Sequence, residues 1–280
     1  MPRHQDAGPG SRTLTPEQEA LPYAKYYHRP VARPNPKLIE ILDRGPMDPV
    51  KALSYEHIND LLDPGYHEVE TGYCILDNGA GYVAVNNVFP GCTVDMMKWW
   101  FAWHAAGPGL RYALWFPPGH VTIAVSDQGR AKLHDPNIPL EEKSQNIDHF
   151  VREDVGGGVE DIVICFLDPK SMGFDMSRFH TPNVAWTFGG YGVSESTVGP
   201  PMKSPAIMLH FCREIEGGVE FRTRFWMGYR IVRGQGRCVL PPWVRIPVEA
   251  PMGLAYHNVM EYSNLGSFLP EIYAEFGPGL

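Results

Sequence analysis

His257 and Glu261 stand four residues apart in a C-terminal segment whose apolar residues are spaced like those of a packed helix. Side chains at this spacing lie on one face of an α-helix, so an imidazole and a carboxylate can converge on one point. A shared metal ion is one use for such a pair. Taken alone, however, an HxxxE pair is more often a polar pair on a protein surface, so the metal hypothesis needs further ligands.

Two other residues are the best candidates to complete a metal site. His120 follows a Pro-Gly turn at the start of a strand-like segment, where a side chain can be aimed into a cavity. Glu153 precedes three consecutive glycines, which let other backbone approach closely. Each also has a structural interpretation, because His120 could be a hydrogen-bonded turn histidine and Glu153 a solvated loop acid. Asp154, the next residue, is an alternative to Glu153.

Two histidines and two carboxylates without a thiolate suit zinc best, with manganese or iron as weaker candidates. The five cysteines are odd in number, scattered and never in a CxxC pair, so we interpret them as buried apolar side chains. Zinc lowers the pKa of bound water to about 7 and polarises carbonyls, which indicates hydrolytic or carbonyl chemistry. The sequence contains no GxSxG elbow, so a water nucleophile is favoured over a serine.

Tyr112 lies eight residues before His120, and a turn between them could bring its phenol near the metal. There it could donate a hydrogen bond to a developing oxyanion. A buried structural tyrosine is almost equally consistent with the pattern.

The composition of the chain limits which kinds of protein and partner are consistent with it. The 280 residues are 44% hydrophobic and 20% charged, enough for one large domain or one domain with a small accessory layer. The net charge of −8 and the lack of a long basic run argue against nucleic acid or an anionic membrane as the main partner. No segment has the length of a membrane span, and the N-terminus lacks the apolar core of a signal peptide. We therefore expect a cytoplasmic protein acting on a small neutral or apolar molecule.

The elements that must position these residues change character along the chain. Residues 1–20 are polar, rich in Pro and Gly and without periodicity, so we expect a disordered tail. Short helices are predicted at 36–42 and 55–62, followed by a hairpin of strands 70–76 and 81–86 around an Asp-Asn-Gly turn.

Thr93 is placed to cap a helix over 94–104 that carries three tryptophans, which we expect in the core. His104, at the end of this helix, is interpreted as a capping residue or a support for the site. Segments with a period of two residues then predict strands, at 121–125, 161–167, 183–188, 206–211 and 219–227. In the last strand, Arg222 and Arg224 share one face, which is typical of a half-exposed antiparallel strand.

The chain ends in a predicted helix over 253–276 in which Pro270 is expected to cause a kink. Many antiparallel strands followed by a long terminal helix indicate an α+β fold in which a curved sheet wraps the helix and encloses a cavity. A cavity between sheet and helix is a natural ligand site.

Several motifs together resemble the 2,4-diacetylphloroglucinol hydrolase and phloretin hydrolase family over about residues 30–276. They are the run from Trp99 to His104, the segment from Arg111 to His120, the segment around Glu153, the run from Arg222 to Gly228, and His257-x-x-x-Glu261 followed by Phe268-Leu-Pro270. Their order and approximate spacing carry the resemblance, because no single motif is highly specific.

The resemblance implies a zinc-dependent hydrolase that cleaves the carbon–carbon bond between an acyl group and a phenolic ring. It implies a Bet v 1-like helix-grip catalytic domain at 89–280, after a small helical region at 21–88 involved in dimerisation, hence a homodimer. The implied zinc ligands are His120, Glu153, His257 and Glu261. Zinc-activated water would attack the acyl carbonyl of a ketonised ring, giving a carboxylic acid and a deacylated phenol.

The same resemblance assigns roles around the metal. Tyr112 falls where the family has a tyrosine that hydrogen-bonds the acyl oxygen. Glu153 or Glu261 could also accept a proton, and His104 could assist catalysis.

Two positions depart from the family pattern in the expected substrate-binding site. Ile123 stands where the family member that cleaves diacetylphloroglucinol has a polar amide. Phe211 takes the place of a second acyl-contacting tyrosine that is expected near this strand. Both changes make the predicted pocket less polar, so a larger acyl chain, another β-diketone or a polyketide intermediate is an alternative substrate.

Two other functions stay open. A helix-grip cavity could carry an aromatic or polyketide ligand without chemistry, its four polar residues being hydrogen-bonded rather than bound to metal. Within enzymes, zinc could polarise a carbonyl in a cyclase or aldol-type reaction that consumes no water.

Overall fold

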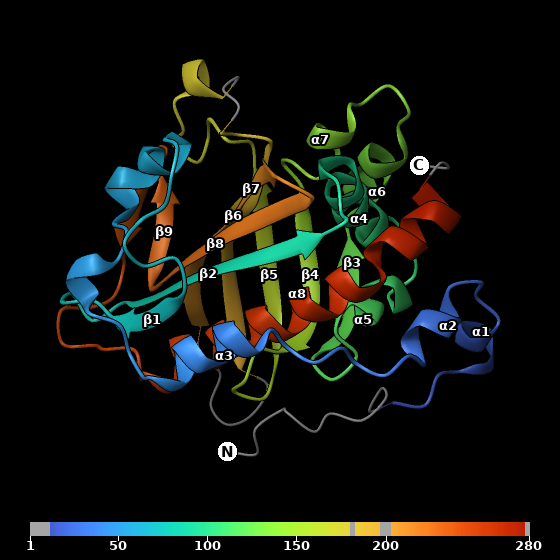
Figure 1. The fold of residues 1–280 in the computed structure, drawn as a ribbon, viewed down its shortest axis with the longest axis horizontal. Helices are drawn as coiled ribbons and strands as arrows, with labels where there is room; N and C mark the ends of the chain where they lie inside the picture. The colour runs from blue at the N-terminus through green and yellow to red at the C-terminus, as the bar shows by residue number, and fades with distance from the viewer. Residues whose placement is uncertain (1–11, 180–182, 197–202, 278–280) are drawn as a thin grey trace.

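The computed structural model describes residues 12–179, 183–196 and 203–277. Its main feature is an eight-stranded antiparallel sheet in the spatial order β1-β2-β8-β7-β6-β5-β4-β3. A long C-terminal helix, α8, crosses one face of this sheet (Figure 1). The strands of the sheet are β1 Gly72–Ile75, β2 Gly81–Pro90, β3 His120–Val125, β4 Asp148–Asp154, β5 Val159–Leu167, β6 Trp186–Ser196, β7 Lys203–Ile215 and β8 Gly218–Met227.

The remaining elements cover the sheet and its edges. Two short strands, β9 Tyr229–Val232 and β10 Gln235–Cys238, form a separate hairpin. The helices are α1 Pro16–Glu19, α2 Ala24–Tyr27, α3 Pro36–Asp43, α4 Val94–Ala106, α5 Leu110–Trp115, α6 Asp127–His134, α7 Leu140–Lys143 and α8 Glu249–Phe276, with 3-10 turns η2 Pro49–Lys51, η3 Tyr55–Leu62 and η4 Met176–Arg178. The mixed fold with a large antiparallel sheet and a long terminal helix is therefore confirmed.

Most predicted elements are present close to their expected bounds. The Asp-Asn-Gly turn joins β1 to β2, and the Thr93 hydroxyl accepts a hydrogen bond from the backbone N–H of Met96 at 3.3 Å at the start of α4. The strand expected from 183 begins only at Trp186. The terminal helix begins earlier than predicted, at Glu249, and includes Pro270. Two elements that position the site, α5 and β4, were not predicted.

One face of the sheet packs against helices, and the other is covered around β2, β7 and β8 but carries exposed side chains on β4 and β5. The tryptophan-bearing helix α4 and the terminal helix α8 pack on one face, and Trp99, Trp100 and Trp103 are buried there as expected. The other face packs against η3, with Trp226 and Phe211 in that second core. The indole of Trp226 donates a hydrogen bond to the carbonyl of Leu53 at 2.8 Å, which ties the N-terminal region to β8.

The N-terminal expectations need correction where the structure describes them. From residue 12 onward the predicted tail is ordered into a chain that contains α1, because Thr15 caps this helix and Leu14 packs in the main core. Residues 1–11 lie outside the described residues. The predicted boundary between 88 and 89 falls inside β2, which pairs with β8 along its whole length.

Strand β8 is not half-exposed, as its pattern had indicated. Arg222 and Arg224 are buried, and each donates hydrogen bonds to the carboxylate of Glu70 at 2.6 Å. The physical reason is that the N-terminal region covers this face of the sheet and brings its own carboxylate. Burial opposes ionisation of Glu70, but the hydrogen bonds and charges of the two arginines outweigh it and lower the pKa of Glu70 to about 2.

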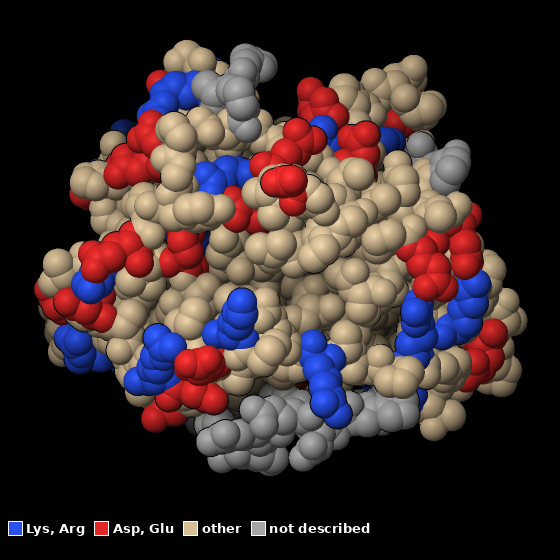
Figure 2. Space-filling model, viewed as in Figure 1, with Lys and Arg blue, Asp and Glu red and all other residues tan. Residues whose placement is uncertain are grey.

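Acidic and basic side chains are interspersed on the visible surface. Among the described residues in Figure 2, no continuous basic patch is present on this face. No helix in the described part of the chain combines the length and apolar character required to cross a membrane.

The ion pairs of Glu70 with the buried Arg222 and Arg224 give the first prediction. We expect Glu70→Gln to lower the free energy of unfolding by about 3–5 kcal/mol, because two buried guanidinium groups lose their counter-charge. Since the pKa of Glu70 falls from 4.5 to about 2 on folding, its stabilisation is present above pH 4.5 and is lost as the pH falls toward 2. Urea unfolding at several pH values measures both effects.

The matched control is Glu40→Gln, which removes an exposed helical ion pair with Arg44. This change should alter stability by no more than about 0.5 kcal/mol. Equal effects of the two substitutions would contradict a structural role for the buried pair.

Candidate active site

Three elements bring the predicted metal ligands together. His120 is the first residue of β3 and pairs directly with Glu153 near the end of β4. His257 and Glu261 lie one turn apart on α8, which crosses this end of the sheet. All four side chains are buried. Contrary to the loop expected around it, Glu153 is therefore fixed by strand pairing, which places its side chain on the same face of the sheet as that of His120.

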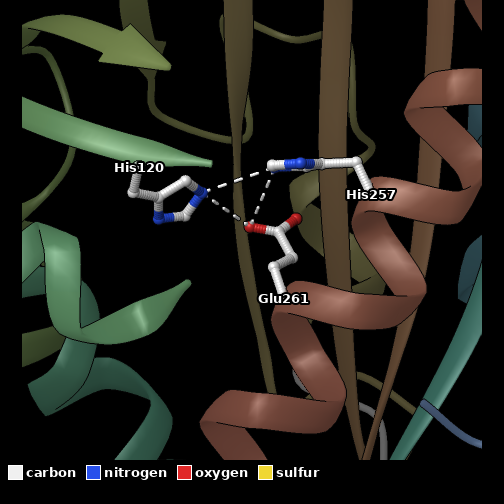
Figure 3. A group of neighbouring side chains, drawn as sticks. All are labelled: His120, His257 and Glu261. Atoms are coloured by element: carbon white, nitrogen blue, oxygen red, sulfur yellow. Dashed lines mark hydrogen bonds and ion pairs between the residues drawn. The ribbon is translucent and has the colours of Figure 1, made fainter. Parts of the chain in front are cut away.

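His120, His257 and Glu261 form a compact group of donor atoms (Figure 3). The Nε2 atom of His120 lies 3.4 Å from Nε2 of His257 and 3.4 Å from Oε2 of Glu261. Nε2 of His257 lies 3.8 Å from the same carboxylate oxygen. A four-coordinate ion with bonds of about 2.0–2.1 Å holds neighbouring ligand atoms about 3.4 Å apart. The spacing thus fits a small metal ion.

Glu153 stands at the margin of this group. Its Oε2 lies 3.3 Å from Nε2 of His120 and accepts a hydrogen bond from the phenol of Tyr112. Among the described residues, the group in which all ligand atoms are close to one another contains only the other three. Glu153 is adjacent to the group and could join it by a small movement of its side chain.

Neighbouring polar groups orient the ligands. The backbone carbonyl of Tyr112 lies 3.3 Å from Nδ1 of His120, so Nδ1 carries the proton and Nε2 presents its lone pair to the group. Asn258 donates from its amide to Oε1 of Glu261 at 3.1 Å, and its own oxygen accepts from Asn87 at 2.9 Å. This chain holds one oxygen of Glu261 and leaves the other for the metal.

Burial sets the protonation states of the group in the absence of a cation. It raises the pKa of Glu261 well above 4.5, helped by the charge of Glu153, and raises the pKa of Glu153 to about 7. It lowers the pKa of His120 well below 6.5, and the nearby His257 acts in the same direction. A bound dication reverses this preference for the carboxylates and favours the neutral histidine.

Tyr112 reaches the site from α5. Its ring stacks on the imidazole of His120 with the centroids 4.2 Å apart, and its hydroxyl donates to Glu153. Burial and the charge of Glu153 raise the pKa of Tyr112 well above 10, so the phenol keeps its proton. As expected, the chain turns between Tyr112 and His120, where the backbone N–H groups of Gly119 and His120 donate to the carbonyl of Phe116, and Tyr112 contacts His120 and Glu153.

A cavity opens beside these residues, between the sheet and α8. Its polar lining includes Tyr112, Glu153, His257 and Glu261 together with His104, His149 and His210. Its apolar lining includes Trp115, Val151, Val155, Ile164, Phe166, Phe188, Met208, Phe225 and Leu254. The predicted cavity between sheet and helix is therefore present.

His104 lies in the wall of this cavity. Its Nδ1 donates to the carbonyl of Trp100 at 2.8 Å, so Nε2 is an acceptor. Burial lowers the pKa of His104 to about 4, which keeps the ring neutral. It is thus a wall residue of the site, and no described contact joins it to the metal group.

The two predicted substrate-binding departures do not line the cavity. Phe211 belongs to the second core on the opposite face of the sheet, because side chains alternate along β7 and its neighbour His210 faces the cavity. Ile123 packs in the main core, paired with Val151 across the strands. Neither position can therefore be used to infer the polarity of the pocket.

Sequence reasoning missed His149, His210 and Trp115. The first could have been found from the period of β4, because His149, Val151 and Glu153 alternate with exposed residues and share one face. The imidazole of His210 lies 2.8 Å from the hydroxyl of Thr223, and burial lowers its pKa to about 3.

The protein thus combines an antiparallel sheet and a long terminal helix with a buried His-His-Glu group beside an aromatic cavity. A family model described as "DAPG hydrolase PhiG domain" matches residues 53–274. The chain belongs to this hydrolase family.

The regions matched by curated relatives cover most of the chain. It is 34% identical to phloretin hydrolase of Eubacterium ramulus over 264 residues, covering 92% of each chain. It is 32% identical to a 2,4-diacetylphloroglucinol hydrolase of a Pseudomonas species over 277 residues, covering 91% of this chain and 88% of the relative. A third match, to the 2,4-diacetylphloroglucinol hydrolase of Pseudomonas protegens, is 31% identical and covers 91% of this chain and 85% of the relative.

The hydrogen bonds that run from Asn87 to Asn258 and from Asn258 to Glu261 give the second prediction. We expect Asn258→Ala to weaken metal affinity about 10- to 100-fold, because the carboxylate loses the group that orients it. The measurement is competition with a chromogenic chelator on untagged protein. Asn264→Ala is the control, since Asn264 is also buried on α8 but bonds the carbonyl of Trp115 instead. Equal metal affinity in the two variants would contradict the orienting role.

Proposed function

We propose that the protein is a zinc-dependent hydrolase that cleaves the carbon–carbon bond between an acyl group and a phenolic ring. The observation that carries the proposal is the buried group of His120, His257 and Glu261 beside a cavity with aromatic walls. The names of the relatives support a substrate of the acylphloroglucinol or phloretin type.

Zinc is the ion we propose, because two imidazoles and carboxylate oxygen without thiolate suit it and the donor spacing matches its bond lengths. Glu153 is proposed as the fourth protein ligand, 3.3 Å from Nε2 of His120. When bound, the ion supplies a Lewis acid that acidifies water and polarises the acyl carbonyl.

The chain's own residues then control proton positions. We propose that Tyr112, whose phenol stays protonated, donates a hydrogen bond to the acyl oxygen as negative charge develops there. Glu153, in contact with Tyr112, accepts a proton from the attacking water. Oxygen bonds to the acyl carbon, the bond from that carbon to the ring breaks, and the electron pair passes to the ring carbon. That carbon takes up a proton, which gives a carboxylic acid and a deacylated phenol.

Three further parts of the proposal concern the fold type, the assembly and the location of the protein. The sheet and α8 together are proposed to be a Bet v 1-like helix-grip domain, and residues 21–88 a small region involved in homodimer formation. A cytoplasmic location stays a prediction. Sedimentation equilibrium of the full chain tests the dimer, and a species of 31.4 kDa at all concentrations would contradict it.

Metal content and oxygen incorporation form the third prediction. We expect about one zinc per chain in untagged protein, and one atom of oxygen-18 from labelled water in the carboxylic acid released from an acylphloroglucinol. A metal-loaded protein that converts a polyketide without taking up labelled oxygen would instead indicate a cyclase. A metal-free protein that binds aromatic ketones, unchanged by added zinc, would indicate a carrier.

The fourth prediction concerns Tyr112. Tyr112→Phe should keep its metal and lower kcat by about 10-fold or more, because it lacks the donor to the developing oxyanion. The control is Tyr55→Phe, which removes a buried phenol that donates to the carbonyl of Met172 on the other face of the sheet. A normal kcat in Tyr112→Phe would assign this tyrosine a packing role only.

A further inference from the structure

The far end of the cavity contains a buried nitrogen that has no hydrogen-bond partner in the part of the chain that the structure describes. His149 lines the cavity and is 2% exposed, and its Nε2 has no hydrogen-bond partner among the described residues. Buried polar atoms are nearly always paired, so an unpaired one in a cavity wall indicates a missing ligand atom.

We propose that His149 is a specificity-determining residue that hydrogen-bonds the phenolic hydroxyl para to the acyl group of the substrate. This inference rests on the proposed function for the identity of the substrate, whereas the subsite itself follows from the geometry of the cavity.

The strand β4 sets the direction of the subsite relative to the metal group. His149 and Glu153 lie four residues apart on the same face, which corresponds to about 13 Å along the strand. Val151 lies between them on that face and also lines the cavity. An acyl group at the Glu153 end therefore directs the ring, and the hydroxyl opposite the acyl group, toward His149.

The walls between the two ends suit an aromatic ring. Phe166 and Phe188 both line the cavity, and their rings stack with centroids 4.0 Å apart. The ring of His149 contacts Phe166 at 4.6 Å between centroids and His104 at 5.9 Å. His149 is thus fixed on two sides by other rings, which limits its freedom to find an alternative partner.

The charge state of this end favours a neutral hydroxyl. Burial lowers the pKa of His149 well below 6.5, and the neighbouring His104 acts in the same direction. No acid or base other than His104 is described in ring contact with His149. A neutral imidazole can accept from or donate to a hydroxyl group without requiring an anion.

A pair of substrates tests the proposal. Monoacetylphloroglucinol is compared with its analogue that lacks only the hydroxyl para to the acetyl group, in zinc-loaded wild-type protein and in His149→Phe. The quantity measured is kcat/KM for monoacetylphloroglucinol divided by kcat/KM for the analogue. The intrinsic reactivity difference between the ketones cancels when the ratio for the variant is divided by that for the wild type.

We expect this ratio to fall about 10- to 100-fold in His149→Phe, because the wild-type site rejects a ring that leaves the nitrogen unpaired. Metal content should stay at the wild-type level. His149→Gln, which restores a polar terminal group, should recover part of the preference. His67→Phe is the matched control: it removes another imidazole whose Nε2 is unpaired among the described residues, but one outside the cavity, and should leave the ratio unchanged.

Equilibrium binding separates failure of this inference from failure of the proposed function. Quenching of tryptophan fluorescence reports binding of phloroglucinol and of resorcinol without any reaction. If no ketone is hydrolysed but the preference for phloroglucinol is lost in His149→Phe, the subsite stands and the hydrolase proposal falls. If hydrolysis proceeds and folded His149→Phe and His149→Gln keep the wild-type preference in both assays, the role of His149 is overturned.

Discussion

Three electron-pair donors that converge in the interior impose the main constraint on this protein. The lone pair of His120 Nε2 is directed at another imidazole and at a carboxylate, all within 3.8 Å and away from solvent. Such a group has a large desolvation cost unless a proton or a cation lies among its members. The amides behind Glu261 and the carbonyl behind His120 hold the donors in place, so the arrangement favours a metal ion over a rearranged set of hydrogen bonds.

The sheet makes this convergence possible because α8 packs on the face that carries the ligands of β3 and β4. On one side α8 contributes His257 and Glu261, while β3 and β4 contribute the ligands opposite. On the other side the N-terminal region fixes the sheet through the Glu70 pair and the indole of Trp226. Strand β4 has one buried and one exposed face, so a register shift of one residue would move His149, Val151 and Glu153 to the exposed face.

The cavity has distinct chemistry at its two ends. Near Glu153 burial raises the pKa of the carboxyl groups, whereas near His149 burial lowers the pKa of the imidazoles and aromatic rings surround them. An acyl phenol has the same asymmetry, with a polarisable carbonyl at one end and a neutral hydroxyl at the other. In the proposed function, this correspondence sets the orientation of the substrate along β4.

Local features could be predicted from the sequence: the helical pair His257 and Glu261, the capped tryptophan helix, the hairpin and most strands. These depend on spacing, caps and turns, which neighbouring residues decide. The family resemblance also correctly indicated the hydrolase class. Three features required the tertiary structure: Phe211 faces away from the cavity, Arg222 and Arg224 are buried, and the face that His149 shares with Glu153 lines the cavity. Each of these depends on which distant segment covers a given face, and the periodicity of one strand does not contain that information.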